Sequence, residues 1–124
     1  MKPDIETHEQ VKLLVDTFYN KVDTNPVIGY IFTDVAKVNW EHHLPKMYSF
    51  WAAMILGDMR YTGNPLQTHI NLSKMTPLTA KEFDEWLLLF NATVDELFEG
   101  PKATDAKLRA LNIAQLMLYK VQTQ

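Results

Sequence analysis

The segment THEQVKLLVDTFYNKV, residues 7–22, decides the fold class of this chain. Thr7 and Gln10 form the pattern of a helix-capping box, in which two side chains satisfy the first backbone N–H groups of a helix. Apolar residues then recur three and four positions apart, which is the period of one helix face. They are Val11, Leu14, Val15, Phe18 and Val22. The segment therefore predicts an amphipathic helix, with Tyr19 at the border of its apolar face.

The same period runs through the rest of the chain. Asn25-Pro26 ends the first helix and opens a single helical turn through Ile31-Phe32, because asparagine caps helices and proline fits only their first position. Further helices are predicted over residues 38–56, from a capping box at Thr79 and Glu82 to Gly100-Pro101, and over about residues 104–119. No alternating strand pattern, repeat or low-complexity tract occurs. We therefore predict an all-α chain with four longer helices and two short ones.

Each of the later helices has an apolar face that we expect to be buried. In the helix over residues 38–56 this face holds His43, Met47, Phe50 and Met54. In the next helix it holds Phe83, Trp86, Leu87, Phe90, Val94 and Leu97. In the last helix it holds Leu108, Leu111, Ala114 or Gln115, and Leu118. His42 lies about 100° away from His43 around the helix axis and is expected on a polar side, while Pro45 fits only near a helix start.

Length, charge and cysteine content exclude several classes of protein. At 124 residues the chain has the size of one domain, which we expect to span residues 1–124. The net charge is −3 and no Lys/Arg cluster matches a row of phosphates, so we expect no nucleic-acid partner. The absence of cysteine excludes disulfides and thiolate metal sites. No stretch approaches the ~18 apolar residues of a membrane helix, so we expect no membrane association and a cytoplasmic location.

Polar-tipped side chains lie on or beside the core faces of three predicted helices. Each of Tyr19, His43 and Trp86 must find a partner there or cost about 1–3 kcal/mol. Taken together, three donors from separate helices indicate a central ligand. His69 comes from a fourth segment, a short helix opened by Asn64-Pro65, where a neutral imidazole can offer one nitrogen to an iron centre.

Other interpretations of the same residues stay open at this point. A plain four-helix bundle explains the periodicity without any ligand, and a lone helical histidine is more often packed than ligating. The histidines do not have the spacing of a known zinc site, since no His-Glu-x-x-His motif occurs. Ser49 and Ser73 have no obvious base or elbow motif, and there is no glycine-rich phosphate loop.

A series of spaced motifs covers nearly the whole chain. In the first half these are Phe18-Tyr19-Asn20-Lys21-Val22, Asn25-Pro26, Gly29, Ile31-Phe32, Trp40-Glu41-His42-His43-Leu44, Met47 and Phe50-Trp51. In the second half they are Gly57, Arg60-Tyr61-Thr62-Gly63-Asn64-Pro65, His69, Trp86-Leu87, Leu89-Phe90, Val94-Asp95-Glu96-Leu97-Phe98, Arg109-Ala110 and Ile113-Ala114. In this order the motifs resemble those of the truncated haemoglobins, and specifically of their group III.

The resemblance implies a fold and a set of roles for the candidate residues. The fold would be a two-over-two helical sandwich around a haem b, iron protoporphyrin IX. His69 resembles the proximal iron ligand, and Tyr19, His43 and Trp86 resemble the distal set around the sixth coordination position. The remaining pocket residues would be Phe32 on the porphyrin face, Met47, Phe50 and Trp51 on the distal wall, and Lys46, Arg60 and Tyr61 toward the propionates.

The resemblance also implies a class of function. A haem iron with one imidazole ligand leaves a site for O2, NO or CO, and donors aimed at a bound O2 stabilise its partial negative charge. We therefore expect tight O2 binding suited to O2/NO redox chemistry or detoxification more than to simple transport, with electrons from a separate reductase. A haem enzyme with peroxidase-like or NO dioxygenase chemistry, acting on peroxide or NO, is the first alternative. A cofactor-free helical binding module is the second.

Overall fold

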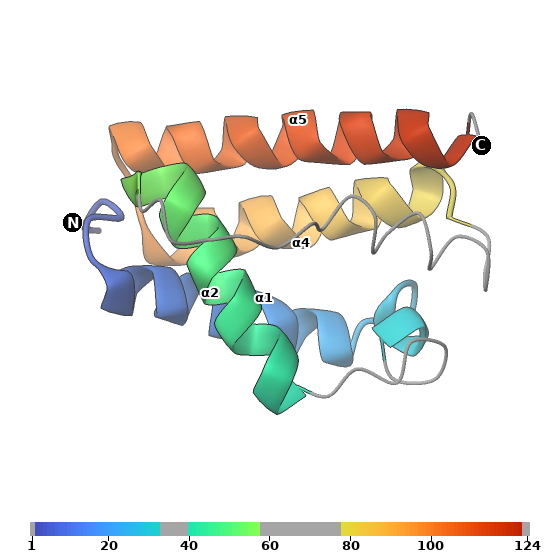
Figure 1. Ribbon diagram of the computed structural model, residues 1–124, viewed down its shortest axis with the longest axis horizontal. Helices are drawn as coiled ribbons and strands as arrows, with labels where there is room; N and C mark the ends of the chain where they lie inside the picture. Colours follow the sequence, from blue (N-terminus) through green and yellow to red (C-terminus); the bar gives the residue numbers. More distant parts are fainter. Residues whose placement is uncertain (1, 33–39, 58–77, 123–124) are drawn as a thin grey trace.

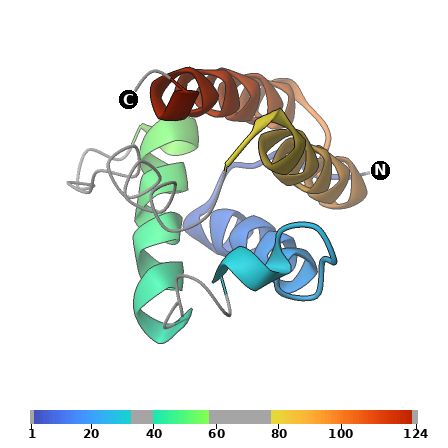
Figure 2. The same cartoon turned by 90° about the vertical axis from the view of Figure 1, so that its right-hand side faces the viewer.

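Four helices enclose the interior of the molecule in a ring. The computed structural model describes residues 2–32, 40–57 and 78–122, with side chains as far as residue 120. The helices are α1 (His8–Asp23), α2 (Trp40–Leu56), α4 (Ala80–Leu97) and α5 (Pro101–Gln122). Helix α1 contacts α2 and α4, while α5 contacts α4 and α2, so each helix has two neighbours (Figures 1 and 2). This arrangement confirms the predicted all-α fold class.

Helix α1 begins and ends where the sequence predicts. The hydroxyl oxygen of Thr7 accepts from the backbone N–H of Gln10, and the side chain of Gln10 accepts from the N–H of Thr7, which completes the capping box. After the helix, the side-chain oxygen of Asn25 accepts from the backbone N–H groups of Val27 and Ile28 at 2.8 and 3.0 Å. These bonds hold the predicted turn after residue 25.

Helix α2 crosses α1 steeply (Figure 1). It contains Pro45 in its second turn, where the missing N–H leaves the helix one intrahelical hydrogen bond short. Its fully buried residues are Trp51, Ala52 and Ile55, whereas the predicted face of His43, Met47, Phe50 and Met54 is half-buried. His42 is exposed, as predicted. Gly57, at φ 76°, follows the last helical residue and ends the helix in a conformation that favours glycine.

The start of α5 differs from the prediction. The helix begins at Pro101, not near residue 104, because Asp4 from the N-terminal segment caps it. The Asp4 carboxylate accepts from the backbone N–H groups of Lys102 and Ala103 at 3.0 and 2.8 Å. Gly100, at φ 137°, lies so close to Asp4 that an added Cβ would be 2.6 Å from its Cγ. A cap that comes from 98 residues away has no local sequence signature.

The buried face of α5 also corrects the prediction. Leu108 and Leu111 are 55% and 37% exposed, so the leucine stripe does not face the core. The buried positions are Ala103, Ala106, Ala110, Ala114 and Met117. Small side chains on this face let α5 pack close to its neighbours, and hydrophobicity alone favours leucine over alanine as a core residue. Of the predicted face only Ala114 is buried, with Leu118 half-buried beside it.

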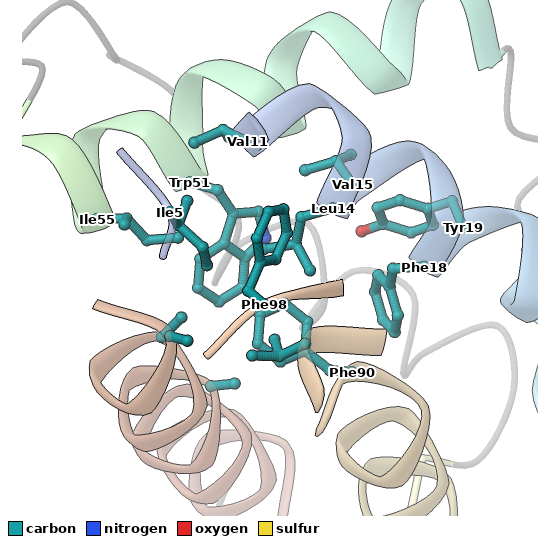
Figure 3. Close-up of a cluster of buried hydrophobic side chains, with 14 of the residues drawn as sticks. Ile5, Val11, Leu14, Val15, Phe18, Tyr19, Trp51, Ile55, Phe90 and Phe98 are labelled. Atoms are coloured by element: carbon teal, nitrogen blue, oxygen red, sulfur yellow. The ribbon is translucent and has the colours of Figure 1, made fainter. Parts of the chain in front are cut away.

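The core is built around large aromatic side chains from three helices. Trp51 of α2 stacks on Phe90 of α4 with ring centroids 4.6 Å apart, and Phe18 of α1 meets Phe90 edge-on at 5.4 Å (Figure 3). All three are about 1% exposed, and each such side chain contributes roughly 1.5–3 kcal/mol by burial. Helices α1, α2 and α4 therefore pack together through the contacts of Phe90 with Phe18 and Trp51. Within the described ranges, no helix combines the length and apolarity needed to cross a membrane.

Candidate ligand pocket

A largely apolar pocket lies between the four helices, and its space of about 680 Å³ includes volume that is open to solvent. Every described helix contributes to its wall. The lining residues are Tyr19, Ile28, Ile31, Phe32, Met47, Phe50, Trp51, Leu78, Glu82, Phe83, Trp86, Ile113, Ala114 and Met117.

Tyr19 of α1 brings a phenol to the pocket wall. Its side chain is 7% exposed, and its ring packs against Phe18 at 4.8 Å and Phe32 at 6.1 Å between centroids. Among the described residues, its hydroxyl has no hydrogen-bond partner. Burial raises the pKa of the phenol well above its usual value, so the hydroxyl stays protonated at neutral pH. The pocket therefore contains an O–H donor that the described part of the protein does not use.

Trp86 of α4 places a second donor on the same wall. Its ring stacks on Phe90 with centroids 5.8 Å apart and meets Phe18 edge-on at 5.7 Å. These contacts hold the indole in one orientation. In the described part of the chain no group accepts a hydrogen bond from its N–H. The structure thus brings Tyr19 and Trp86, predicted from separate helices, to one pocket.

His43 lies directly behind Tyr19. The two rings meet edge-on with centroids 5.1 Å apart, and Trp40 packs against both of them, 5.6 Å from each centroid. The Nε2 atom of His43 is buried. His43 is not among the lining residues of the pocket in this structure, and Lys46, one turn further along α2, is exposed.

The four apolar residues predicted to surround a cofactor all line the pocket. They are Phe32, Met47, Phe50 and Trp51. Phe32 comes from the turn after α1 and stacks on Trp40 with an interplanar angle of 22°. The stripe on α2 is only half-buried because two of its members, Met47 and Phe50, face this cavity.

Three predicted site residues lie outside the described residues: His69, Arg60 and Tyr61. Their positions are therefore not placed by the structure. Among the described side chains, no group of three or more His, Asp or Glu residues could hold a metal ion. A metal in this pocket would have to arrive inside a cofactor or be bound by a residue such as His69.

Part of the pocket wall was not predicted from the sequence. Ile113 and Met117 of α5 line it, although the leucine stripe was expected to face inward. Glu82 of α4 also lines it while its carboxylate accepts from the N–H of Thr79 at 2.7 Å in the predicted capping box. Ile28 and Leu78, which lie outside the long helices, carry no periodic signal. For α5, the alternation of alanines three and four residues apart was the available signal.

Comparison with known proteins agrees with this architecture. A family model described as bacterial-like globin matches residues 4–119. The chain is 32% identical to the group 3 truncated hemoglobin ctb of Campylobacter jejuni over 126 aligned positions, which cover 97% of this chain and 97% of that protein. It also superposes on the crystal structure of a group III truncated hemoglobin from Campylobacter jejuni with a TM-score of 0.84 and 28% identity. That match covers 98% of this chain and 95% of the other.

Proposed function

The chain belongs to the bacterial-like globin family, as a group III truncated haemoglobin, and from this premise we propose that it holds a haem b between its four helices and binds O2 there. Globins bind haem and small gaseous ligands, and we extend this to NO and CO as further ligands of the same site. In this proposal residues 1–124 form one globin domain.

The described residues fit a haem. A porphyrin is a flat apolar plate with polar edges, and the pocket is lined mainly by aromatic and aliphatic side chains. Phe32, Phe50 and Trp51 supply flat surfaces for the porphyrin. We propose His69 as the proximal ligand, with Lys46, Arg60 and Tyr61 toward the propionates. When bound, the haem supplies an iron with one open coordination position for a diatomic ligand.

Two unused donors on the pocket wall carry the proposal. The hydroxyl of Tyr19 and the indole N–H of Trp86 have no acceptor within the described residues, and both side chains line the pocket. Both can donate to a ligand that carries partial negative charge. In a dry pocket such bonds are stronger than in water. We therefore propose that these two side chains retain O2, which favours redox chemistry or detoxification with an external reductase over transport.

His43 favours a second candidate function, in which peroxide is the substrate. Its buried Nε2 lies in a ring packed against Tyr19, so a proton could pass between this atom and a ligand held beside the phenol. Peroxidase-like turnover of a one-electron donor by the ferric protein, above that of free haem, would support this candidate. Turnover equal to free haem would leave O2 and NO binding as the function.

Absorption spectroscopy of the purified protein tests the proposal. We expect a Soret band that shifts on reduction with dithionite and again on addition of CO, and a higher unfolding temperature in the haem-loaded protein. His69→Ala should lose or alter the ferrous Soret band, whereas His42→Ala, at an exposed position on α2, should leave it unchanged. If unfolding is indifferent to haem, the chain is a cofactor-free helical module and the proposal is wrong.

A further inference from the structure

Residues 25–32 form the corner that follows α1, and we call them the corner segment. The side chains that it contributes to the pocket wall are Ile28, Ile31 and Phe32. The corner segment packs tightly on the end of α1, because a Cβ added at Gly29 would lie 2.9 Å from the carbonyl oxygen of Val22. The position of this segment therefore shapes one part of the pocket.

Asn25, the first residue of the corner segment, uses both ends of its side-chain amide. The oxygen accepts from the backbone N–H groups of Val27 and Ile28, as described above, while the nitrogen donates to the carboxylate of Glu85 on α4 at 3.0 Å. Asn25 and Glu85 are both half-buried. Aspartate or serine would cap the corner equally well, but neither has an amide that donates to Glu85. The cap alone therefore does not account for asparagine at this position.

The hydrogen bond between Asn25 and Glu85 joins two parts of the pocket wall. Glu85 directly precedes Trp86, one of the two pocket donors, and consecutive Cα atoms are about 3.8 Å apart. At the other end, the corner segment carries Phe32, whose ring packs against the ring of Tyr19 with centroids 6.1 Å apart. The bond thus connects the segment that contacts one donor to the helix position next to the other.

We propose that Asn25 and Glu85 are positioning residues, whose hydrogen bond holds the corner segment in place against α4 and so keeps the donors of Tyr19 and Trp86 in one arrangement. Neither Asn25 nor Glu85 lines the pocket, so both act through the neighbours that do. Loss of a hydrogen bond to a carboxylate corresponds to roughly a tenfold change in an equilibrium constant. Without the bond, the corner segment should therefore open roughly tenfold more often. The effect on a bound ligand rests on the proposed haem function, whereas the effect on the corner segment does not.

Substitutions at the two positions separate this bond from the cap and from charge. Asn25→Asp keeps a cap oxygen but places two carboxylates side by side, which breaks the bond, and Glu85→Ala removes the acceptor without adding charge. Glu85→Gln keeps an acceptor oxygen. Asn25→Asp combined with Glu85→Gln reverses donor and acceptor, because the new amide can donate to the new carboxylate, and should restore the bond. Asn20→Asp, at an exposed position on α1, is the charge control.

Hydrogen exchange of the full chain as purified tests whether the bond holds the corner segment. The backbone N–H of Gly29 bonds the carbonyl of Asn25 at 3.0 Å, and that of Ile31 bonds the carbonyl of Ile28 at 3.1 Å, so these two amides report opening of the segment. We expect both to exchange roughly tenfold faster in Asn25→Asp and Glu85→Ala, and at the wild-type rate in the combined variant and the charge control. Equal rates in all variants would overturn the proposal. This measurement does not need haem, so a chain without a Soret band would refute the proposed function alone.

Infrared spectroscopy of the reduced, haem-loaded protein with CO tests the effect on the pocket donors. The stretching frequency of bound CO responds to hydrogen-bond donors beside it, so it reports their arrangement and not the stability of the fold. Asn25→Asp and Glu85→Ala should shift or split the CO band, while the combined variant and the charge control should give the wild-type band. If Asn25→Asp lowers stability but leaves the band unchanged, the bond only stabilises the fold and the positioning role is wrong.

Discussion

Replacing Tyr19 with phenylalanine should change stability and ligand retention in opposite directions. The side chain of Tyr19 is buried, but its hydroxyl faces the pocket and finds no acceptor among the described residues, so in the haem-free protein it contributes no hydrogen bond to the fold. Burying such a hydroxyl costs about 1–3 kcal/mol in mutational data, less where water reaches it. Because the hydroxyl faces an open pocket, we take the low end, and expect Tyr19→Phe to be neutral or to stabilise by up to about 1 kcal/mol.

The effect on a bound ligand has the other sign. A hydrogen bond to a group with substantial charge is worth about 1.5–3 kcal/mol, which corresponds to roughly 10- to 150-fold in a rate or equilibrium constant. Tyr19→Phe should therefore release O2 from the reduced, haem-loaded protein roughly 10- to 150-fold faster. Stopped-flow dissociation measures the rate, and urea unfolding of the haem-free protein measures the stability.

Tyr48→Phe is the matched control, because it removes the same hydroxyl from a tyrosine whose hydroxyl does have a hydrogen-bond acceptor. The Tyr48 hydroxyl donates to the carboxylate of Asp16, which also pairs with Lys12 at 2.8 Å. Its removal should lower the free energy of unfolding by about 1 kcal/mol and leave O2 dissociation unchanged, since Tyr48 does not line the pocket. If Tyr19→Phe destabilises the haem-free protein by more than about 1 kcal/mol, or leaves the O2 off-rate unaltered, the assignment of Tyr19 as an unused donor is refuted.

Three further predictions concern helix α5 and the contacts at its N-terminal end. Burial acts against ionisation of Asp4, but bonds from the backbone N–H groups of Lys102, Ile5 and Ala103 lower its pKa in the folded state. The Asp4 cap therefore contributes about 1 kcal/mol to the free energy of unfolding above pH 3.8, the pKa of the free side chain, and this contribution is lost as the pH falls through the lower pKa of the folded state. Urea unfolding should show Asp4→Ala less stable than wild type near neutral pH and equally stable in acid. Gly100→Ala should destabilise by more than about 1 kcal/mol in thermal unfolding, because φ is 137° and the new Cβ would meet Asp4 at 2.6 Å, whereas equal stability would mean that the segment shifts freely. Ala110→Leu should lower the free energy of unfolding by about 1–3 kcal/mol by overpacking the buried face of α5, while Leu111→Ala should lower it by less than about 1 kcal/mol. If urea unfolding gives the reverse order, the leucines and not the alanines form the buried face of this helix.

Local signals predicted the parts of the fold that local interactions determine. Both capping boxes form as expected, at Thr7 and Thr79, because each needs only four consecutive residues. The turn after Asn25 forms for the same reason. The start of α5 could not be predicted in this way, since its cap is supplied by Asp4 from the opposite end of the chain.

The buried face of α5 shows a limit of periodicity. Leucine and alanine stripes run along this helix together, and the larger hydrophobic gain belongs to leucine. The structure buries the alanines because α5 packs closely, with Ala106 and Ala110 fully inaccessible. The choice between the two stripes depends on the distance between helices, which is a tertiary quantity. Ile113 and Met117 were missed as pocket residues through the same error.

The candidate site was predicted from two signals. Of the three polar-tipped residues singled out on core-facing stripes, Tyr19 and Trp86 line the pocket and His43 does not, whereas the four apolar residues implied by the resemblance all line it. Apolar residues from a turn or a connector, such as Ile28 and Leu78, break no pattern and were not identified. His69, on which the resemblance places the iron, lies outside the described residues and stays a prediction.

Tyr19 and Tyr48 together show why composition does not identify a site. Both are tyrosines on amphipathic helices next to the core, yet the hydroxyl of Tyr48 is satisfied by Asp16 while that of Tyr19 has no acceptor in the described structure. Phenylalanine at position 19 would fill the same place in the core without a hydroxyl that lacks an acceptor in the described structure. A tyrosine there is explained if the acceptor is a ligand that the fold itself does not contain. This asymmetry, more than the volume of the pocket, argues for a polar ligand beside Tyr19.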